Sequence, residues 1–359
     1  MTQRERQILQ WIEQDPMISQ EALAEKAGIT RSSVAVHISN LIKKGYIIGK
    51  GYVLRSGTYA AVVGGVNMDI GGQSDGPLVP GDSNPGRVRI SLGGVGRNIA
   101  HNMALLGLDV RFLTAFGDDL YAQRIAASCG ELGIDISQAL RVPGGSTSTY
   151  LYLNGPDGDM ALAVSDMDIC RKMTPQFLAS RLTLLKGAQL IVADANLPAE
   201  SLRFLADHGA APLFVDPVST VKAEKLRPIL GKIHTLKPNR MEAELLSGVA
   251  ITNEESLRQA AQGLLDTGLR RVFISLGSRG LFAADHRESL LLPCRPAAPV
   301  NATGAGDAFM AGLAWAYLEG TDLRGTALAG ASAGAIAIEG SETINPALSP
   351  EVLRARMDR

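Results

Sequence analysis

Cysteines are scarce in this sequence. Cys129, Cys170 and Cys294 are the only three in 359 residues, and no two of them have the spacing of metal ligands. An odd number of widely separated cysteines fits neither a disulfide framework nor a zinc site, so we expect reduced thiols in the core. Long apolar runs are also missing, and the N-terminus MTQRERQILQ lacks the basic and then apolar plan of a signal peptide. These absences favour a cytoplasmic protein with no membrane partner.

Three common phosphate-binding motifs are absent as well. The chain has no G-x-x-x-x-G-K-[ST] loop, and it has neither a protein-kinase catalytic loop nor a D-F-G motif. The segment GVGRNI at residues 94–99 lacks the last glycine of a dinucleotide-binding fingerprint, and no acidic residue follows it at the required spacing. These observations argue against a P-loop enzyme, a protein kinase and a Rossmann dehydrogenase.

The length and composition predict one large domain preceded by a small one. Apolar residues make up 46% of the chain and charged residues 20%, which is enough to bury a full core. The net charge of −1 hides an asymmetry, because residues 1–57 hold eight Lys and Arg against five Asp and Glu, and the remainder holds 27 against 31. We expect domains at 1–56, the head, and 57–359, the body. Only the head is suited to a polyanion.

The head has three stretches of apolar residues with the spacing of short helices. Pro16 ends the first stretch, Ser19 opens the second, and Thr30 is placed to cap the third. The segment GYIIGKGYVL then predicts two short strands around a glycine turn, a wing with Lys50 at its tip.

The pattern A-x-x-A-G-I-T-x-x-x-V at residues 24–34 resembles the winged helix-turn-helix of bacterial regulators. In that family the third helix enters the major groove of DNA. The resemblance implies base contacts from one set of side chains and phosphate contacts from another: Arg31, Ser32, Ser33 and Val36, and then Lys43, Lys44 and Lys50. A helical packing or dimerisation module that touches no DNA is the alternative. Because the head is only weakly basic, specific DNA binding would need two heads, which favours a homodimer.

The body alternates short β-rich runs with helical stretches, which predicts an α/β fold with a mostly parallel sheet and ligands at the carboxyl ends of its strands. Two segments break this rhythm, near 71–92 and 147–166. Their polar and apolar residues alternate around turn signals, as in strands with one face in water. We expect them to form a small sheet that covers the site as a lid.

The segment TGAGD at residues 303–307 precedes a largely uncharged helical stretch. Small residues at a helix N-terminus leave backbone N–H groups open to an anion, and the helix dipole favours negative charge there. We therefore expect Asp307 to stay ionised and to take a proton from a substrate hydroxyl while the amides of Gly304, Ala305 and Gly306 hold a phosphoryl group. A helix-capping role explains the aspartate but not the small residues before it.

Together with G-G-V-G-R-N at residues 93–98, this motif resembles the paired signature of the ribokinase-type (PfkB) carbohydrate kinases. The resemblance implies a ribokinase-like three-layer α/β sandwich with a small β-sheet lid, and an ATP-dependent kinase with Asp307 as its catalytic base. Asn239 and Glu242 match a family motif that organises Mg²⁺, although Asn-x-x-Glu is also a capping box. The resemblance places ATP against a further set of residues: Asn239, Ser275, Gly277, Gly280 and Thr303.

The acceptor must be judged from finer detail. The resemblance implies that the acceptor is bound by Asn67, Asp69, Gly93, Gly94 and Asn98, and we add Asp166 after the second lid segment. Segments such as DSNPG and GGVGRNIA resemble the pseudouridine kinases of the family, which implies transfer to the 5′-hydroxyl of a nucleoside. A sugar kinase or another nucleoside kinase is one alternative, and a transcription regulator with a ligand-sensing body is another. Neutral Asn301, where many members carry an acidic residue, puts K⁺ activation in doubt.

Overall fold

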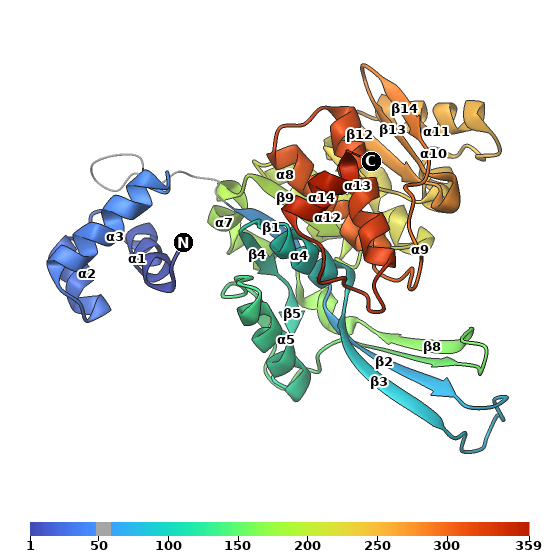
Figure 1. Cartoon of the computed structure of the whole chain (residues 1–359), viewed down its shortest axis with the longest axis horizontal. Coiled ribbons are helices and arrows are strands. Elements are labelled where there is room, and N and C mark those ends of the chain that lie inside the picture. The colour runs from blue at the N-terminus through green and yellow to red at the C-terminus, as the bar shows by residue number, and fades with distance from the viewer. Residues whose placement is uncertain (48–58, 359) are drawn as a thin grey trace. The chain divides into compact units, whose positions relative to one another are not determined.

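The computed structural model describes residues 1–47 and 59–358, and the chain divides into two compact units, residues 1–58 and 59–359 (Figure 1). Lys50 and most of the expected wing lie outside the described residues. Among the described helices, none has the length and apolarity that a membrane span requires.

The head is a three-helix unit, as the sequence predicted. Its helices are α1 (Gln3–Gln14), α2 (Gln20–Ala27) and α3 (Arg31–Lys43). The side chains of Thr2, Ser19 and Thr30 cap the three N-termini by accepting backbone N–H groups. The helices enclose a core of their own: Ile8, Leu9, Ile12, Ile18, Leu23, Val34, Ile38, Leu41 and Ile47.

The body is built on an eight-stranded sheet with the order β14-β13-β12-β11-β10-β9-β1-β4. Its parallel strands are β1 (Ala60–Val63), β4 (Val110–Leu113), β9 (Leu190–Asp194), β10 (Leu213–Asp216), β11 (Thr235–Leu236) and β12 (Arg271–Ser275). The mostly parallel sheet that the sequence predicted is confirmed. The antiparallel hairpin of β13 (Leu281–Asp285) and β14 (Ser289–Leu292) extends the sheet at one edge and was not predicted.

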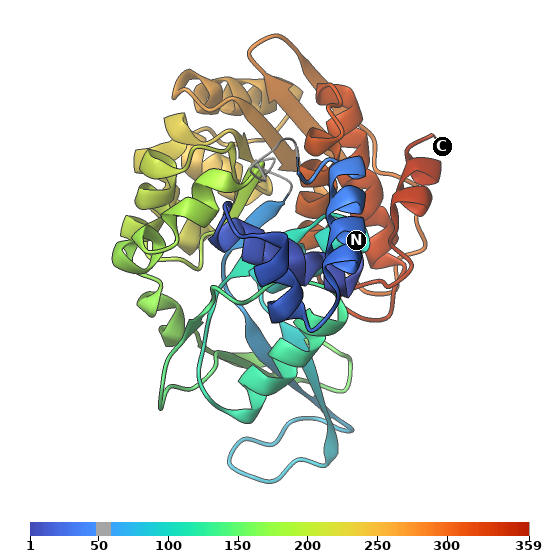
Figure 2. The ribbon, with the colours of Figure 1, turned by 90° about the vertical axis from the view of Figure 1, so that its left-hand side faces the viewer.

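Helices cover both faces of this sheet, which gives the three expected layers (Figure 2). One layer contains α4 (Val95–Leu105), α5 (Leu120–Glu131), α12 (Ala305–Leu318), α13 (Leu323–Ile338) and α14 (Pro350–Met357). The other contains α6 (Pro175–Ala179), α7 (Leu182–Gly187), α8 (Ala199–His208), α9 (Thr220–Ala223), α10 (Arg240–Ser247) and α11 (Glu254–Asp266). Helices α12 and α13 pack closely because Gly312 and Gly330 bring the two backbones together.

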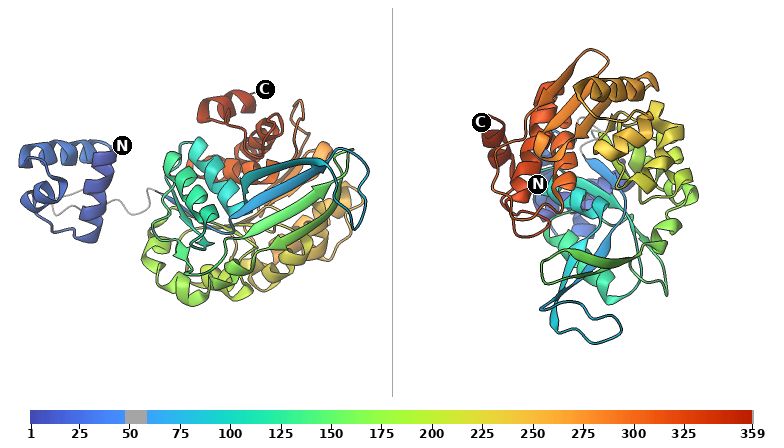
Figure 3. Two further views of the ribbon diagram at one scale, coloured as in Figure 1. Left: turned by 90° about the horizontal axis from the view of Figure 1, so that it is seen from below. Right: turned by 90° about the vertical axis from the view of Figure 1, so that its right-hand side faces the viewer.

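Four strands form the lid, a separate sheet that projects from the body (Figure 3). Their order is β3 (Gly86–Gly93), β2 (Asn67–Ser74), β7 (Thr149–Asn154) and β8 (Met160–Asp166). The expected lid is thus confirmed. The register sorts its side chains into two faces, because residues opposite each other on paired strands point to the same side. Asp69 lies opposite Ser91 and Tyr150, and Tyr150 lies opposite Ser165, so these four share the polar face.

Candidate active site

Asp307 lies in the first turn of α12, where the sequence predicted the catalytic carboxyl group. Gly304, the residue before the helix, has φ 82°, and a Cβ there would clash with the Thr343 carbonyl. A glycine is therefore required for the turn that presents the helix N-terminus. The Asp307 side chain is buried, and Asn98 of α4 donates its Nδ2 to Asp307 Oδ2 at 2.9 Å. Residues from both motifs thus meet in one site.

Burial is the main cause that raises the pKa of the Asp307 carboxyl group to about 8, and the negative charge of Asp216 adds to it. The hydrogen bond from Asn98 and the charge of Lys237 act in the opposite direction. Our expectation of an ionised carboxylate is therefore corrected, because exclusion of water outweighs the stabilisation expected from the helix end. A base with a pKa near 8 is still well matched to proton abstraction close to neutral pH.

Two more aspartates and a lysine lie around Asp307, and the sequence analysis gave them no role. Asp194 and Asp216 end the neighbouring strands β9 and β10, and the charge of each helps to raise the pKa of Asp307. Lys237 follows β11 and is 7% exposed, and its Nζ lies 3.1 Å from Asp216 Oδ2. The sequence could have indicated these three residues, because each ends or follows a predicted strand and parallel strands end at the same edge of the sheet.

A cavity of about 470 Å³ opens beside the N-terminus of α12. Ser275, Gly277 and Gly280 line it, as the predicted nucleotide loop should, together with Ala305 and Gly306. On α13 its wall consists of the small residues Ala331, Gly334 and Ala335, while Thr303 and Asn239 are not among the lining residues. Asn239 is nevertheless bridged to Ser275 by backbone pairing. The cavity is of the size and apolar character that a nucleoside moiety needs.

Cys294 also lines this cavity and is exposed, whereas Cys129 and Cys170 are buried. The expectation of three core thiols is therefore wrong for Cys294, which lies on an irregular segment after β14 rather than on a core element.

Asn239 and Glu242 form the capping box of α10. Asn239 Oδ1 accepts the Glu242 backbone N–H at 2.9 Å, and Glu242 Oε2 accepts the Asn239 backbone N–H at 2.8 Å. Burial raises the pKa of the Glu242 carboxyl group. Within residues 1–47 and 59–358, no group of three His, Cys, Asp or Glu side chains could hold a metal ion. Mg²⁺ bound through one carboxylate, waters and nucleotide phosphates needs no such group, so this donor set fits it.

The predicted acceptor residues gather where the lid joins the body. Asn67 is buried and donates its Nδ2 to Asp69 Oδ1 at 2.6 Å, and burial raises the pKa of the Asp69 carboxyl group. A Cβ on Gly93 would clash with this carboxyl group, and a Cβ on Gly94, with φ 99°, would clash with the Val66 backbone. The glycines therefore permit the backbone to approach Asp69 and Val66 closely.

Asp166 does not join this group. It ends β8 opposite Thr149, so the register places it on the lid face that does not carry Asp69. Ser165, which lies opposite Tyr150, shares the face of Asp69 instead. The prediction for Asp166 is corrected on this ground: the sequence pattern located the strand but missed its register by one residue.

Asn301 bonds to its own loop and to the segment at Ser341. Its Oδ1 accepts the Thr303 backbone N–H at 2.9 Å, and its Nδ2 donates to the Ser341 carbonyl at 3.3 Å. The side chain thus shapes the approach to α12 and contributes no negative charge.

In the head, most of the predicted DNA-contacting side chains are exposed on α3. Arg31, Ser32, Ser33, Val36 and Lys43 all reach the surface. Lys44 is also exposed, but its Nζ lies 2.7 Å from Oε2 of the buried Glu5. This bond holds the pKa of the Glu5 carboxyl group down at about 2. Since its ammonium group is committed to Glu5, Lys44 is a structural residue, which argues against a phosphate contact.

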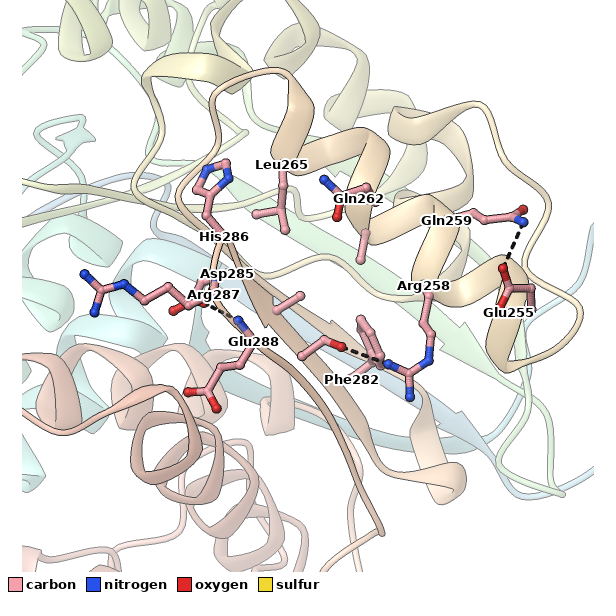
Figure 4. Close-up of a pocket in the computed structure, with 13 residues that line it drawn as sticks. Glu255, Arg258, Gln259, Gln262, Leu265, Phe282, Asp285, His286, Arg287 and Glu288 are labelled. Atoms are coloured by element: carbon pink, nitrogen blue, oxygen red, sulfur yellow. Dashed lines mark hydrogen bonds between the residues drawn. The ribbon is translucent and has the colours of Figure 1, made fainter.

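A second hollow, of about 430 Å³, lies between α11 and the β13–β14 hairpin (Figure 4). Two of its polar side chains bond to others in the lining: Gln259 donates to Glu255 at 3.2 Å and Arg258 donates to Ser289 at 2.9 Å. No sequence-predicted site residue lines it.

Comparison with known proteins shows the family of each region of the chain. The pfkB family carbohydrate kinase model matches residues 58–350, and a winged helix-turn-helix DNA-binding model matches residues 1–48. Ribokinase from Thermotoga maritima shares the fold, with a TM-score of 0.76 and 23% identity over 84% of this chain and 100% of its own. The uncharacterized sugar kinase YeiI of Escherichia coli K12 is 40% identical over 98% of both chains. The pseudouridine kinase of the same strain is 39% identical over 82% of this chain and 95% of its own.

The body therefore has the ribokinase-like α/β fold with a β-sheet lid. The chain belongs to the pfkB family of carbohydrate kinases and carries an N-terminal winged helix-turn-helix region. It is a phosphotransferase that uses an alcohol group as acceptor, and kinases of this family in general use ATP and Mg²⁺.

Proposed function

We propose that this chain transfers the γ-phosphoryl group of ATP to the 5′-hydroxyl of a nucleoside, with pseudouridine as the preferred acceptor. The observation that carries the proposal is the hydrogen bond between Asn98 and Asp307. It joins the first turn of α12, whose Ala305 and Gly306 line the cavity, to the helix that follows Gly93, which lies against Asp69. The choice of pseudouridine is supported by the 39% identity to the E. coli pseudouridine kinase.

The chemistry follows from this geometry. The small residues of α13 leave room for the adenine ring, and the N–H groups of Gly304, Ala305 and Gly306 would hold the γ-phosphoryl group at the positive end of α12. Asp307 takes the proton of the 5′-hydroxyl, the 5′-oxygen attacks the γ-phosphorus, and ADP leaves. Asp69 would accept hydrogen bonds from the ribose hydroxyls. Mg²⁺, held through the Glu242 carboxylate and water, would offset the charge of the phosphates.

The test is a panel of acceptors. ATP consumption is measured with pseudouridine, uridine, cytidine, inosine, ribose and fructose at equal concentrations. We expect the highest kcat/KM with pseudouridine. A clear preference for ribose or fructose would overturn the nucleoside assignment and leave a sugar kinase, the reading favoured by the 40% identity to YeiI.

Occupancy of the cavity by ATP can be tested separately. Because Cys294 is exposed at the cavity while Cys129 and Cys170 are buried, iodoacetamide should label Cys294 first. ATP should slow this labelling, which mass spectrometry would follow. An unchanged rate at millimolar ATP would mean that the nucleotide binds elsewhere.

A second function, DNA binding by the head, is favoured by the match to the winged helix-turn-helix model and by the exposed residues of α3. Pseudouridine would then be both acceptor and effector. Anisotropy titrations with DNA from upstream of the gene, with and without pseudouridine, test it. No sequence-specific binding at low salt would leave the head a packing module.

We further propose a homodimer formed by the apolar lid face, which we define as Val88, Ile90, Leu151, Leu153, Leu162 and Val164. Each of these side chains is at least 36% exposed, and the register places all of them on the face opposite Asp69. An exposed apolar patch of this kind marks an interface. A second copy is the partner that would bring two heads together for DNA.

A further inference from the structure

Arg97 is a buried cation in the first turn of α4, with 6% of its surface exposed. Its guanidinium group makes three hydrogen bonds, all to neutral acceptors. Nη1 donates to the Leu92 carbonyl at 3.2 Å and to Asn98 Oδ1 at 3.4 Å, and Nη2 donates to Ser128 Oγ at 3.2 Å. Within the described part of the chain, no carboxylate forms an ion pair with it. A buried charge without such a partner costs free energy, which indicates a role other than stability.

The three bonds hold the guanidinium group from different elements. Leu92 belongs to the lid strand β3, close to the point where the lid joins the body, and Ser128 belongs to α5. The backbone of Arg97 is fixed as well, since its N–H donates to the Gly65 carbonyl at 3.1 Å. Because a guanidinium group presents its donors in a rigid planar fork, contacts on two sides determine where the remaining donor points. That donor faces Asn98.

The Asn98 side chain lies between this cation and the candidate base. Its Oδ1 accepts from Arg97, and its Nδ2 donates to Asp307 Oδ2 at 2.9 Å. Among the described residues, these are the two hydrogen-bond partners of the Asn98 amide. A carboxamide accepts at one end and donates at the other. If the amide were turned by 180°, its NH₂ group would meet the donors of Arg97 and its oxygen would meet the Asp307 carboxylate. Arg97 and the ionised Asp307 therefore favour the same orientation.

Arg97 also acts on the acceptor side of the site. Burial raises the pKa of the Asp69 carboxyl group, and the hydrogen bond from Asn67 and the positive charge of Arg97 oppose this effect. The guanidinium group is thus close enough to influence one carboxyl group by its charge, while it is connected to another, Asp307, through Asn98.

We propose that Arg97 is a positioning residue for phosphoryl transfer, which fixes the Asn98 amide so that its Nδ2 holds one oxygen of Asp307 and leaves the other for the proton of the acceptor hydroxyl. Through the Leu92 carbonyl, the same guanidinium group joins the base of the lid to this arrangement. The proposal rests on the proposed function, because it requires Asp307 to act as the base.

The test is a double-mutant cycle on kcat, for the wild type, Arg97→Met, Asn98→Ala and Arg97→Met/Asn98→Ala. The acceptor is the compound of the panel with the highest kcat/KM. Arg97→Met should lower kcat about tenfold or more, because the base loses its alignment. In the Asn98→Ala background the same substitution should lower kcat by less than about twofold, because the group through which it acts is absent. The affinity for ATP, measured from protection of Cys294, should stay within about twofold in Arg97→Met, because its contacts are not to the nucleotide cavity.

Two further variants separate positioning from packing. Ser128→Ala removes a bond of the guanidinium group but not the one to Asn98, so kcat should stay within about twofold of the wild type. Arg97→Lys keeps the charge and should recover part of the kcat lost in Arg97→Met. Thermal unfolding checks that each variant is folded, and if Arg97→Met is not, Arg97→Lys takes its place in the cycle, where a smaller loss of kcat should again disappear in the Asn98→Ala background.

Three results would overturn the proposal. Loss of kcat by the same factor in both backgrounds would mean that Arg97 does not act through Asn98. An unchanged kcat in folded Arg97→Met would mean that the amide needs no anchor, and a parallel loss of ATP affinity would mean that the substitution disturbs the whole site. Asp307→Asn distinguishes this inference from the proposed function. If that variant keeps its turnover, both fail, whereas an inactive Asp307→Asn beside a fully active Arg97→Met removes the inference alone.

Discussion

The head and the body place their candidate functional residues in opposite ways. In the head these residues are exposed and lie within a few positions of one another on α3. In the body they are buried and come from distant parts of the chain: Asn98 and Asp307, joined by a hydrogen bond, are 209 residues apart. The exposed side chains of α3 can be changed without disturbing the core of the head, whereas the body must fold completely before its site exists. The two regions should therefore respond differently to the same kind of change.

Deletion of the head should have the largest effect, because it separates DNA binding from the kinase reaction. Deletion of residues 1–56 should abolish DNA binding, while kcat and KM for the kinase reaction change by less than about twofold. The reason is that the nucleotide cavity, Asp307 and the lid all belong to a unit with its own core. Steady-state kinetics and anisotropy titrations check the two halves. A truncated chain that is folded by circular dichroism but inactive would show that the regions depend on each other.

Replacing the buried carboxyl group tests the body. Asp307→Asn should lower turnover by about 10²-fold or more, because asparagine keeps the shape but cannot accept a proton. ATP should still protect Cys294 from alkylation. Asp166→Asn is the matched control, since it changes an exposed aspartate on the other face of the lid and should leave turnover unchanged within about twofold. Retention of more than about a tenth of wild-type turnover by Asp307→Asn would exclude it as the base.

Features that are set by residues close together in the sequence could be predicted from it, whereas features set by contacts between distant residues could not. The caps at Ser19 and Thr30, the six parallel strands and the TGAGD turn were predictable, because each is set by neighbouring residues. The register that places Asp166 on the lid face opposite Asp69 was not, since a shift of one residue reverses the face of a strand. The ion pair of Lys237 with Asp216 and the pKa of Asp307 depend on burial, which only the assembled sheet creates.

The apolar lid face is an exposed surface of the body, so a substitution there should impair an interaction without impairing the fold, as we expect for the exposed residues of the head. Val164→Asp should weaken dimerisation about tenfold or more, because a charge would replace an apolar contact at the interface. Val221→Asp is a matched control, since Val221 is 82% exposed on α9, outside the lid. Analytical ultracentrifugation measures both. A wild-type chain that stays monomeric at tens of micromolar would remove the lid from consideration as an interface.

The buried carboxyl group should also make the kinase reaction depend on pH. With the pKa of Asp307 raised to about 8, proton abstraction requires the ionised form that is populated above it. At low concentrations of both substrates the rate should therefore rise about tenfold per pH unit below 8 and level off above it. Rates across pH 6 to about 10 check this. A profile already flat from pH 6 would mean that Asp307 is ionised in the free enzyme.

The smallest effect concerns two adjacent lysines of the head. Lys44→Met should destabilise the head by about 1 kcal/mol, because it leaves the buried Glu5 carboxylate without its partner. Lys43→Met should leave stability unchanged and weaken DNA binding, with the slope of log affinity against log salt reduced by about 1.

The contribution of the Glu5–Lys44 pair should also depend on pH. Because the pKa of Glu5 is lowered from 4.5 to about 2, this contribution is present above about pH 4.5 and is lost as the pH falls through 2. Thermal unfolding of the isolated head at pH 7 and pH 3, for both variants, measures the difference. If Lys44→Met changed the salt slope but not the stability, Lys44 would be one of the lysines that contact phosphate. The separation between structural and DNA-binding residues in the head would then be less clear than the comparison with the body suggests.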